Sequence, residues 1–317
     1  MKQRKAIDAQ AAATMISLCA IWGTQQVAIK LAAADMAPLL QVGLRSGAAA
    51  IVVLLVILGR REHRALGGGT WRPGLIVGAL FALEFILFAQ GLVFTSASHM
   101  SIFLYTAPVF AALGLHLAIP QERLTAIQWL GIAVAFAGIV VTFSGRGSAG
   151  GNDRAWLGDL MGIAAGAAWG ATTLAVRTTR LASIPASVTL WYQLAGAGLL
   201  ATAAAVVSRE TAVRPSATLF ASLGYQTLVI SVASYLAWFA LLRRYLASRL
   251  GVLSLLTPVF GIGFGMIVLH DRLSLPFVLG ALVILAGILL VNARDVLARR
   301  GRHPHVRSVP LFSRSRS

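Results

Sequence analysis

The chain has 317 residues, of which 58% are hydrophobic and only 12% are charged. A soluble protein of this size could not hide so much apolar surface, so the composition excludes the ordinary soluble classes and indicates a surface that faces lipid. The net charge of +17 could indicate nucleic-acid binding, but Lys and Arg stand in short connectors and in the C-terminal tail. That distribution is typical of membrane topology signals, and no nucleic-acid partner is expected. The single cysteine, Cys19, excludes a disulfide within the chain.

The first apolar run, Ala11–Ala33, follows Lys2, Arg4 and Lys5 and could be mistaken for a secretory signal peptide. It is long enough to span a bilayer, which takes about 20 residues, and longer than the apolar part of a typical signal. Part of it also recurs later in the chain. We therefore interpret it as the first transmembrane helix.

Nine further runs pass the same length criterion, so the sequence predicts an all-α integral membrane protein with ten transmembrane helices. The ten predicted spans are Ala11–Ala33, Leu39–Leu58, Pro73–Phe94, Ser98–Ala118, Leu124–Phe143, Leu157–Val176, Ser187–Val207, Ser216–Ala240, Leu250–Leu269 and Leu273–Asn292. Most connectors are short, so consecutive spans should be antiparallel neighbours.

The distribution of Lys and Arg predicts the orientation of these spans. With the N-terminus inside, the inner segments carry 20 of these residues and the outer connectors carry five. Positive charge concentrates on the cytoplasmic side, so both termini should be cytoplasmic. Residues 1–10 then form a cytoplasmic N-terminus, residues 144–156 an extracytoplasmic linker, and residues 293–317 a basic cytoplasmic tail, rich in Arg and Ser and expected to be disordered.

The chain contains an internal duplication at a shift near 147–150 residues. Four segments align in the same order: Ala20–Lys30 with Ala167–Arg177, Thr106–Phe110 with Leu256–Phe260, Glu122–Leu124 with Asp271–Leu273, and Leu124–Phe143 with Leu273–Asn292. The halves, residues 11–143 and 157–292, each hold five spans. Because five is odd, the second half should enter the membrane inverted, a recurring plan of secondary transporters.

These duplicated motifs resemble the EamA-type drug/metabolite transporter superfamily over about Ala11–Asn292. The marks that carry the resemblance are Trp22-Gly23 and Trp169-Gly170 in the first helix of each half, Ala97-Ser98 and Ala247-Ser248 before the fourth, a proline within the fourth, and spaced glycines in the fifth. His270-Asp271 departs from the usual Gly-Glu. The resemblance implies transport of a small organic metabolite by alternating access, more often outward, in a bacterial inner (plasma) membrane, without naming the cargo.

Four charged residues fall within the predicted spans. Lys30 and Arg45 are near outer ends and are expected to snorkel toward headgroups, and Asp159 is near a helix N-terminus, which favours a carboxylate. Glu84 is different, because it is roughly 16 Å from either end of its span by helix rise and cannot snorkel. Two interpretations stay open: a protonated carboxyl that bonds a neighbouring helix, or a group in the substrate or proton pathway.

Two tryptophans occupy equivalent positions in the repeats, each with polar side chains about one turn later. Helical spacing places them on one face, which suits an organic solute with a polar end, although the same pattern also fits plain packing. The candidate substrate-binding residues are Trp22, Gln25, Gln26, Glu84, Tyr105, Trp169, Thr172, Thr173, Tyr225 and Gln226.

Pro108 and Pro258 each remove a backbone hydrogen bond in mid-span and should kink the fourth and ninth helices. They are either paired hinges or fixed kinks. Glycines recur every fourth residue from Gly158 to Gly170, a pattern that favours tight helix packing.

No enzyme, nucleotide-binding or metal-site motif is present, so no catalytic residue, cofactor or metal ligand is expected. The sequence predicts a secondary transporter in a lipid bilayer, with an amino-acid-like or amphipathic solute as its cargo. A proton-coupled drug exporter that uses Glu84 is the alternative within transport. A membrane enzyme or a non-transporting scaffold is the alternative of another class. A transporter should have a central cavity lined by both halves, whereas a scaffold should be packed solid there.

Overall fold

The computed structural model describes residues 8–67, 69–144, 154–245, 250 and 253–297. The helices before residue 145 are α1 (Ala9–Gly23), α2 (Gln25–Leu31), α3 (Pro38–Gly59), α4 (Arg64–Gly67), α5 (Trp71–Phe94), α6 (Ala97–Leu104), α7 (Ala107–Ala118), the 3-10 turn η1 (Pro120–Glu122) and α8 (Ala126–Ser144). Those after residue 153 are α9 (Ala155–Thr178), the 3-10 turn η2 (Arg180–Ser183), α10 (Ala186–Val207), α11 (Ala217–Gly224), the π-helix η3 (Tyr225–Ser234), α12 (Tyr235–Arg244), α14 (Leu256–Leu269) and α15 (Leu275–Leu297).

The regular elements of the described chain are all helical, as the sequence predicted. Eight helical stretches there are long and apolar enough to cross a membrane, and they correspond to the first eight predicted spans. The last two predicted spans correspond to shorter apolar helices, Leu256–Leu269 and Leu275–Val291. Helices suit this setting because each satisfies its backbone polar groups internally. The arrangement of ten spans as an inverted repeat stays a prediction.

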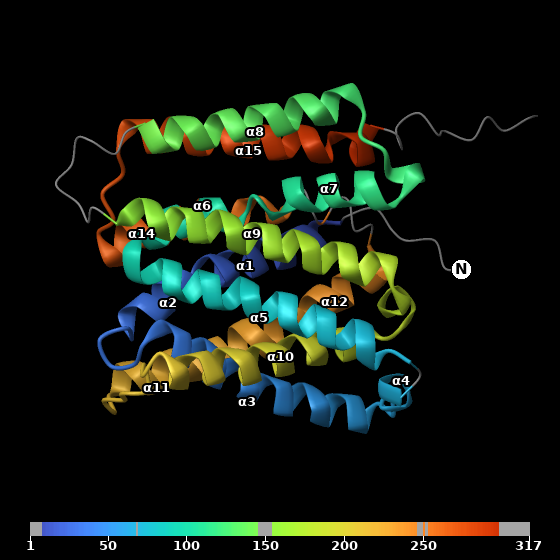
Figure 1. Cartoon of the computed structure of the whole chain (residues 1–317), viewed down its shortest axis with the longest axis vertical. Helices are drawn as coiled ribbons and strands as arrows, with labels where there is room; N and C mark the ends of the chain where they lie inside the picture. Colours follow the sequence, from blue (N-terminus) through green and yellow to red (C-terminus); the bar gives the residue numbers. More distant parts are fainter. Residues whose placement is uncertain (1–7, 68, 145–153, 246–249, 251–252, 298–317) are drawn as a thin grey trace, which may run out of the picture.

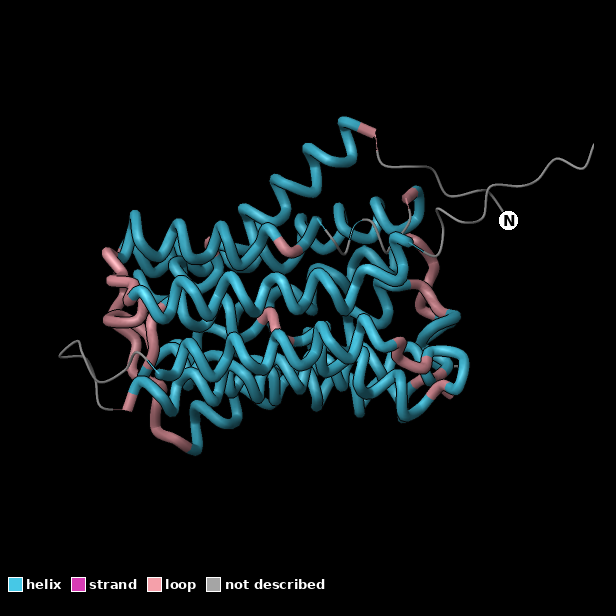
Figure 2. Tube along the Cα trace, turned by 90° about the horizontal axis from the view of Figure 1, so that it is seen from above, coloured by secondary structure: helices cyan, strands magenta, loops and turns pink. Residues whose placement is uncertain are grey.

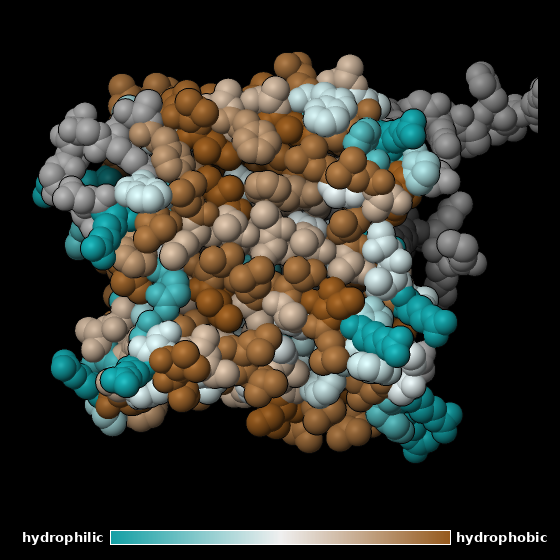
Figure 3. Space-filling model, viewed as in Figure 1, coloured by the Kyte–Doolittle hydropathy of each residue, from teal (hydrophilic) through white to brown (hydrophobic). Residues whose placement is uncertain are grey.

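The helices lie side by side along one direction, with α8 and α15 paired at one edge of the molecule (Figure 1). Loops gather at the two ends of the bundle, and a few short interruptions occur midway along it (Figure 2). On the face shown in Figure 3, hydrophobic side chains cover the middle and hydrophilic ones gather toward both ends of the helices. This banding is the pattern of a surface that crosses a bilayer.

Several spans are interrupted near their middle. The first span breaks at Thr24 between α1 and α2, and the fourth breaks at Tyr105 and Thr106 between α6 and α7. Pro108 therefore lies in the first turn of α7, where its missing N–H is tolerated, and α14 likewise begins just before Pro258. The predicted disturbances near both prolines are present as helix breaks, and a hinge role for them stays a prediction.

The eighth span contains a feature that the sequence did not predict. Residues Tyr225–Ser234 form a ten-residue π-helix between α11 and α12. Such stretches are rare and frequently accompany functional sites, because they change the direction of the side chains that follow.

Glycines let α8 and α15 approach closely. A Cβ at Gly138 would lie 2.6 Å from the backbone nitrogen of Ile284, and one at Gly287 would lie 2.5 Å from that of Ala135. The glycines of α9 also pack tightly, since a Cβ at Gly158 would lie 2.6 Å from the carbonyl oxygen of Gly91. The prediction of close small-residue packing in this helix is thereby confirmed.

Two carboxylates of the second half hold the start of α6 at one end of the bundle. Asp159 is fully buried, accepts a hydrogen bond from the Thr95 hydroxyl, and lies 2.9 Å from Nδ1 of His99. Asp271 accepts from the backbone nitrogen and the hydroxyl of Ser98, at 2.9 Å and 2.8 Å. Asp159 therefore does more than complement the dipole of its own helix: it joins α9 to α6.

The predicted N-terminus, linker and tail fall mainly outside the described residues, as does the Ala247-Ser248 pair. For Arg45 the structure overturns the expectation of snorkelling, because only 2% of this residue is exposed. Arg45 is buried between helices because α3 turns this position inward, against α5.

Candidate functional site

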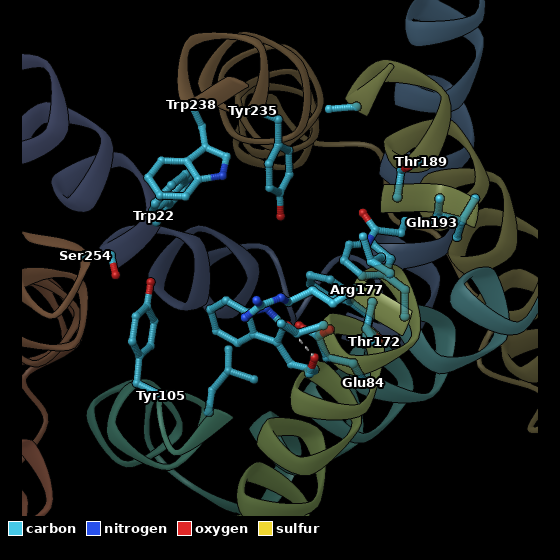
Figure 4. Close-up of a pocket in the computed structure, with 18 of the residues that line it drawn as sticks. Trp22, Glu84, Tyr105, Thr172, Arg177, Thr189, Gln193, Tyr235, Trp238 and Ser254 are labelled. Atoms are coloured by element: carbon cyan, nitrogen blue, oxygen red, sulfur yellow. Dashed lines mark hydrogen bonds between the residues drawn. The ribbon is translucent and has the colours of Figure 1, made fainter. Parts of the chain in front are cut away.

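A cavity of about 570 Å³ lies inside the helix bundle. Its walls come from α1, α2, α5, the end of α6, α9, η2, α10 and α12, together with the segment before α14. Figure 4 shows aromatic rings and polar side chains from these elements converging on the same space. Helices from both sequence-related halves thus contribute to one internal cavity.

Eight of the ten candidate binding residues line this cavity, and they come from five different helical segments. They are Trp22, Gln25, Gln26, Glu84, Tyr105, Trp169, Thr172 and Thr173. Helical spacing along α9 places Trp169, Thr172 and Thr173 on a cavity-facing surface. In the first half, Trp22 lines the cavity from α1 and its polar neighbours line it from α2, on either side of the break at Thr24.

Tyr225 and Gln226 do not line the cavity. The hydroxyl of Tyr225 lies 2.7 Å from that of Thr24, and the Gln226 amide donates to Gln41 at 3.0 Å and to Ser222 at 2.8 Å. The two residues begin the π-helix η3, whereas the cavity-lining Tyr235 directly follows its last residue. They belong to a buried polar network between helices.

Aromatic side chains form much of the wall. The Trp22 and Trp238 ring centroids are 5.7 Å apart at an interplanar angle of 74°, and those of Tyr105 and Trp169 are 5.4 Å apart at 87°. Both pairs are edge-to-face, a favourable geometry for aromatic rings. The indole Nε1 of Trp22 donates to the Ser234 hydroxyl at 2.8 Å, which fixes the orientation of that ring.

Several further residues line the cavity that were not predicted, because the sequence carries little signal for them. They are Phe81, Phe85, Leu104, Val176, Arg177, Leu181, Ala182, Ile184, Ala186, Thr189, Gln193, Tyr235, Trp238 and Ser254. Phe81 lies on the helical face of Glu84 and could have been inferred from it. Tyr235 and Trp238 face the cavity because the π-helix before them resets the helical register, which no periodicity reveals.

The polar groups of the wall differ in what they can offer a solute. The Thr172 hydroxyl donates to the carbonyl of Ala168 at 2.9 Å, and the Thr173 hydroxyl donates to that of Trp169 at 3.1 Å. Their hydrogens are used within α9, so each presents acceptor lone pairs to the cavity. Glu84, 4% exposed, has no hydrogen-bond partner at Oε2, and Gln26 has none at Oε1.

The cavity extends toward one end of the bundle. Its lining includes Arg177 at the end of α9, Leu181 in η2 and Ala186 at the start of α10. Arg177 is paired with Glu122 of η1, so its charge is compensated at this rim. The contacts that join Thr95 and Ser98 to the second half belong to the opposite end, which contributes no residue to the described lining.

No group of three or more His, Cys, Asp or Glu side chains within the described residues has the geometry of a metal site. The cavity wall itself carries one carboxylate, Glu84, and one guanidinium, Arg177. The arrangement is suited to holding an organic solute by apolar contact and a few directed polar groups.

The sequence matches the EamA-like transporter family over residues 10–144 and again over residues 156–293. It is 24% identical to the uncharacterized transporter YoaV of Bacillus subtilis, over 87% of this chain and 94% of that protein. Two proteins named "Probable amino-acid metabolite efflux pump" are also similar. The one from Escherichia coli is 27% identical over 84% of this chain and 90% of that protein. The one from Salmonella typhimurium is 29% identical over 88% of this chain and 93% of that protein.

A solved crystal structure shares the fold. It aligns with a TM-score of 0.63 at 21% identity and covers 93% of this chain and 100% of the other. At that identity the likeness concerns the fold alone.

Proposed function

The chain belongs to the EamA-like transporter family, and from that premise we propose that it moves a small organic solute across a bacterial inner membrane by alternating access. The observation that carries the proposal is the internal cavity, which helices of both halves line. A scaffold would gain stability by filling such a space with side chains, because interiors are otherwise packed to the density of organic crystals. A lined, unfilled space between two halves is what a carrier requires.

The two halves, residues 11–143 and 157–292, are proposed to be inverted repeats related by a two-fold axis in the membrane plane. The duplicated Trp-Gly, proline and glycine motifs support this, as does the match of the family to both halves separately. An inverted pair offers two equivalent packings, one open to each side of the membrane. Residues 144–156 would then connect the halves outside the cell.

Both termini are proposed to be cytoplasmic, on the strength of the Lys and Arg distribution. With that orientation, the end reached by the cavity is the cytoplasmic end, because Arg177 and Arg180 flank it. The conformation then corresponds to the inward-facing state, in which a solute enters from the cytoplasm. The opposite end is held by the Asp159 and Asp271 contacts.

The solute is proposed to be amino-acid-like or amphipathic and to be exported. Aromatic walls and a few polar groups suit such a molecule. The names of the Escherichia coli and Salmonella typhimurium relatives, which are those of amino-acid metabolite efflux pumps, support the same class and direction.

A proton-coupled drug exporter is the second candidate, and one observation favours it. Glu84 lies in the cavity wall, is buried within a membrane span, and leaves Oε2 without a partner. A carboxylate in that place can hold either a proton or a cationic solute, which is the basis of exchange.

Flux through the purified protein tests the proposed function. Proteoliposomes that contain the full chain are loaded with a bacterial metabolite extract, and the external medium is profiled over time. Selective release of one or more solutes supports transport. Equal release from vesicles with the Trp22→Ala, Trp169→Ala double variant, at equal protein content, would contradict transport through this cavity.

A further inference from the structure

Arg45 is a buried charge without the partners that such a charge requires. It lies on α3 within a predicted span, is 2% exposed, and has no hydrogen-bond partner at Nε or Nη1. Removing a guanidinium from water is costly unless its donors are satisfied. A buried cation in a membrane protein therefore indicates a functional site by default.

The position of Arg45 relative to the cavity is defined by Phe85. The guanidinium carbon is 4.8 Å from the centroid of the Phe85 ring, and Phe85 lines the cavity. The carboxyl group of Glu84, which lines the cavity, is close enough to act electrostatically on Arg45. Arg45 is thus directly behind one wall, with the Phe85 ring beside it.

Glu84 supplies the opposite charge next to Phe85 in the sequence. Its Oε2 atom makes no hydrogen bond, although the residue is 4% exposed. In a direct, fully bonded ion pair, Nε or Nη1 of Arg45 would donate a hydrogen bond to Oε2 of Glu84. Instead, two donor atoms of Arg45 and one acceptor atom of Glu84 are left without a hydrogen-bond partner, with Glu84 in the cavity wall and Arg45 behind Phe85.

We propose that Arg45 recognises the carboxylate, and Glu84 the ammonium group, of a zwitterionic solute. The inference rests on the proposed function and narrows its substrate class to molecules that carry both groups a few atoms apart, as α-amino acids do. Rotation of the Phe85 side chain admits the carboxylate to the guanidinium. Arginine suits this role because its planar donors can bind both oxygens of a carboxylate at once.

Arg177 is less suited to that role, although it lines the cavity. It is at the rim, at the end of α9, and is paired with Glu122. Among the charged side chains that line or back the described cavity, Arg45 is the cation whose donors are free for a solute.

Binding can be measured without knowing the transported solute. Three of the seven tryptophans, Trp22, Trp169 and Trp238, line the cavity, so a bound solute changes the intrinsic fluorescence of the full-length protein in nanodiscs. The probes are matched sets built on leucine, phenylalanine and threonine. Each set contains the free amino acid, its carboxamide, which lacks the carboxylate, and its N-acetyl derivative, which lacks the ammonium group.

We expect at least one free amino acid to bind about tenfold or more tightly than both of its capped forms, since each capped form loses one charge-assisted contact. Arg45→Gln should weaken binding of the free amino acid to the level of its carboxamide and leave the affinity for the carboxamide unchanged. Glu84→Gln should weaken binding of the free amino acid to the level of its N-acetyl form and leave the affinity for the N-acetyl form unchanged. Arg45→Lys, which keeps the charge without the fork, should retain part of the preference.

Gln41→Leu is the matched control, because Gln41 is buried one turn earlier on α3, bonds Ile29 and Gln226, and does not line the cavity. It should lower thermal stability without changing the preference for the free amino acid. If Arg45→Gln is poorly folded, Arg45→Lys decides the question.

Three results would overturn the proposal: equal binding of free and capped forms, an unchanged preference in Arg45→Gln, or no response to any of the probe sets. The proposed function is judged separately. Release of other solutes from extract-loaded proteoliposomes would keep the transporter assignment while refuting zwitterion recognition.

Discussion

The indole nitrogen of Trp22 and the hydroxyl of Ser234 are joined by a hydrogen bond of 2.8 Å, although 212 residues separate them in the sequence. Ser234 in turn donates to the carbonyl of Ile230 at 2.5 Å. Trp22 is on α1 and Ser234 ends the π-helix η3, so this chain of bonds fixes the first span against the eighth. The bond thereby holds one aromatic wall of the cavity in place.

Ser234→Ala should weaken solute binding, because Trp22 loses its acceptor and its ring can turn. The cost in stability should be about 1 kcal/mol, the usual contribution of one buried hydrogen bond. Affinity from tryptophan fluorescence and the thermal unfolding midpoint measure the two effects. Trp71→Phe, at an exposed position off the cavity, is the control and should change neither. Lower stability with unchanged affinity would assign the bond to packing alone.

Trp169→Ala should reduce transport more than it reduces the amount of protein in the membrane. The ring lines the cavity and stacks edge-on against Tyr105, so its loss removes contact area from the binding site. Trp129→Ala is the matched control, since Trp129 is exposed on α8 and does not line the cavity. Flux per unit of protein is the measurement. Parallel loss of flux and abundance would favour a packing role.

Glu84→Gln should separate a coupling role from a structural one. Glutamine resembles a protonated glutamate in shape and hydrogen bonding, but it cannot carry the charge. We expect normal protein levels and loss of the pH-dependent part of the flux. Under the alternative of a structural role, Glu84→Gln should behave like the native protein and Glu84→Leu, which removes the polar group, should lower stability. Normal pH dependence in Glu84→Gln would refute proton coupling at this residue and would leave the transporter assignment intact.

Gly287→Ala should destabilise the α8–α15 pair by about 1–3 kcal/mol, the usual cost of overpacking. The added methyl group would meet the backbone of Ala135 at 2.5 Å and the carbonyl oxygen of Gly131 at 2.6 Å. Gly263→Ala is the control, because nothing lies within 4 Å of a Cβ there, and it should be neutral or slightly stabilising. Equal unfolding midpoints of the two variants would contradict this packing.

A reporter fused after Asn292 should be active only when it functions in the cytoplasm. The prediction follows from the 20 Lys and Arg assigned to the inner side and the five assigned to the outer side. Paired fusions of a cytoplasmic and an exported reporter at the same site provide the test. Activity of the exported reporter would reverse the orientation, and with it the side of the membrane that the cavity faces.

Hydropathy was enough to predict the helical class and the positions of the first eight spans, because burial in lipid demands runs of apolar residues that are visible along the chain. Motif spacing was enough to predict that Trp22 and Trp169 lie near polar residues about one turn away, and these residues line the same cavity. Tyr225 and Gln226 were also candidates for the lining, but their side chains bond other helices. The π-helix that begins at Tyr225 has no signature in the hydropathy pattern.

The location of the Arg45 side chain is the clearest case that the sequence did not predict. Its distance from the end of a span predicted snorkelling, but the side chain is buried against Phe85 on another helix. The sequence by itself determined the membrane class, the helical content, the duplication and the family, because these depend on composition and on local periodicity. Only the tertiary structure decided which side chains share the cavity and that Arg45 is behind its wall, against Phe85. Those relations depend on how helices distant in sequence pack, and apolar helices of similar composition can pack in many ways that hydropathy alone does not distinguish.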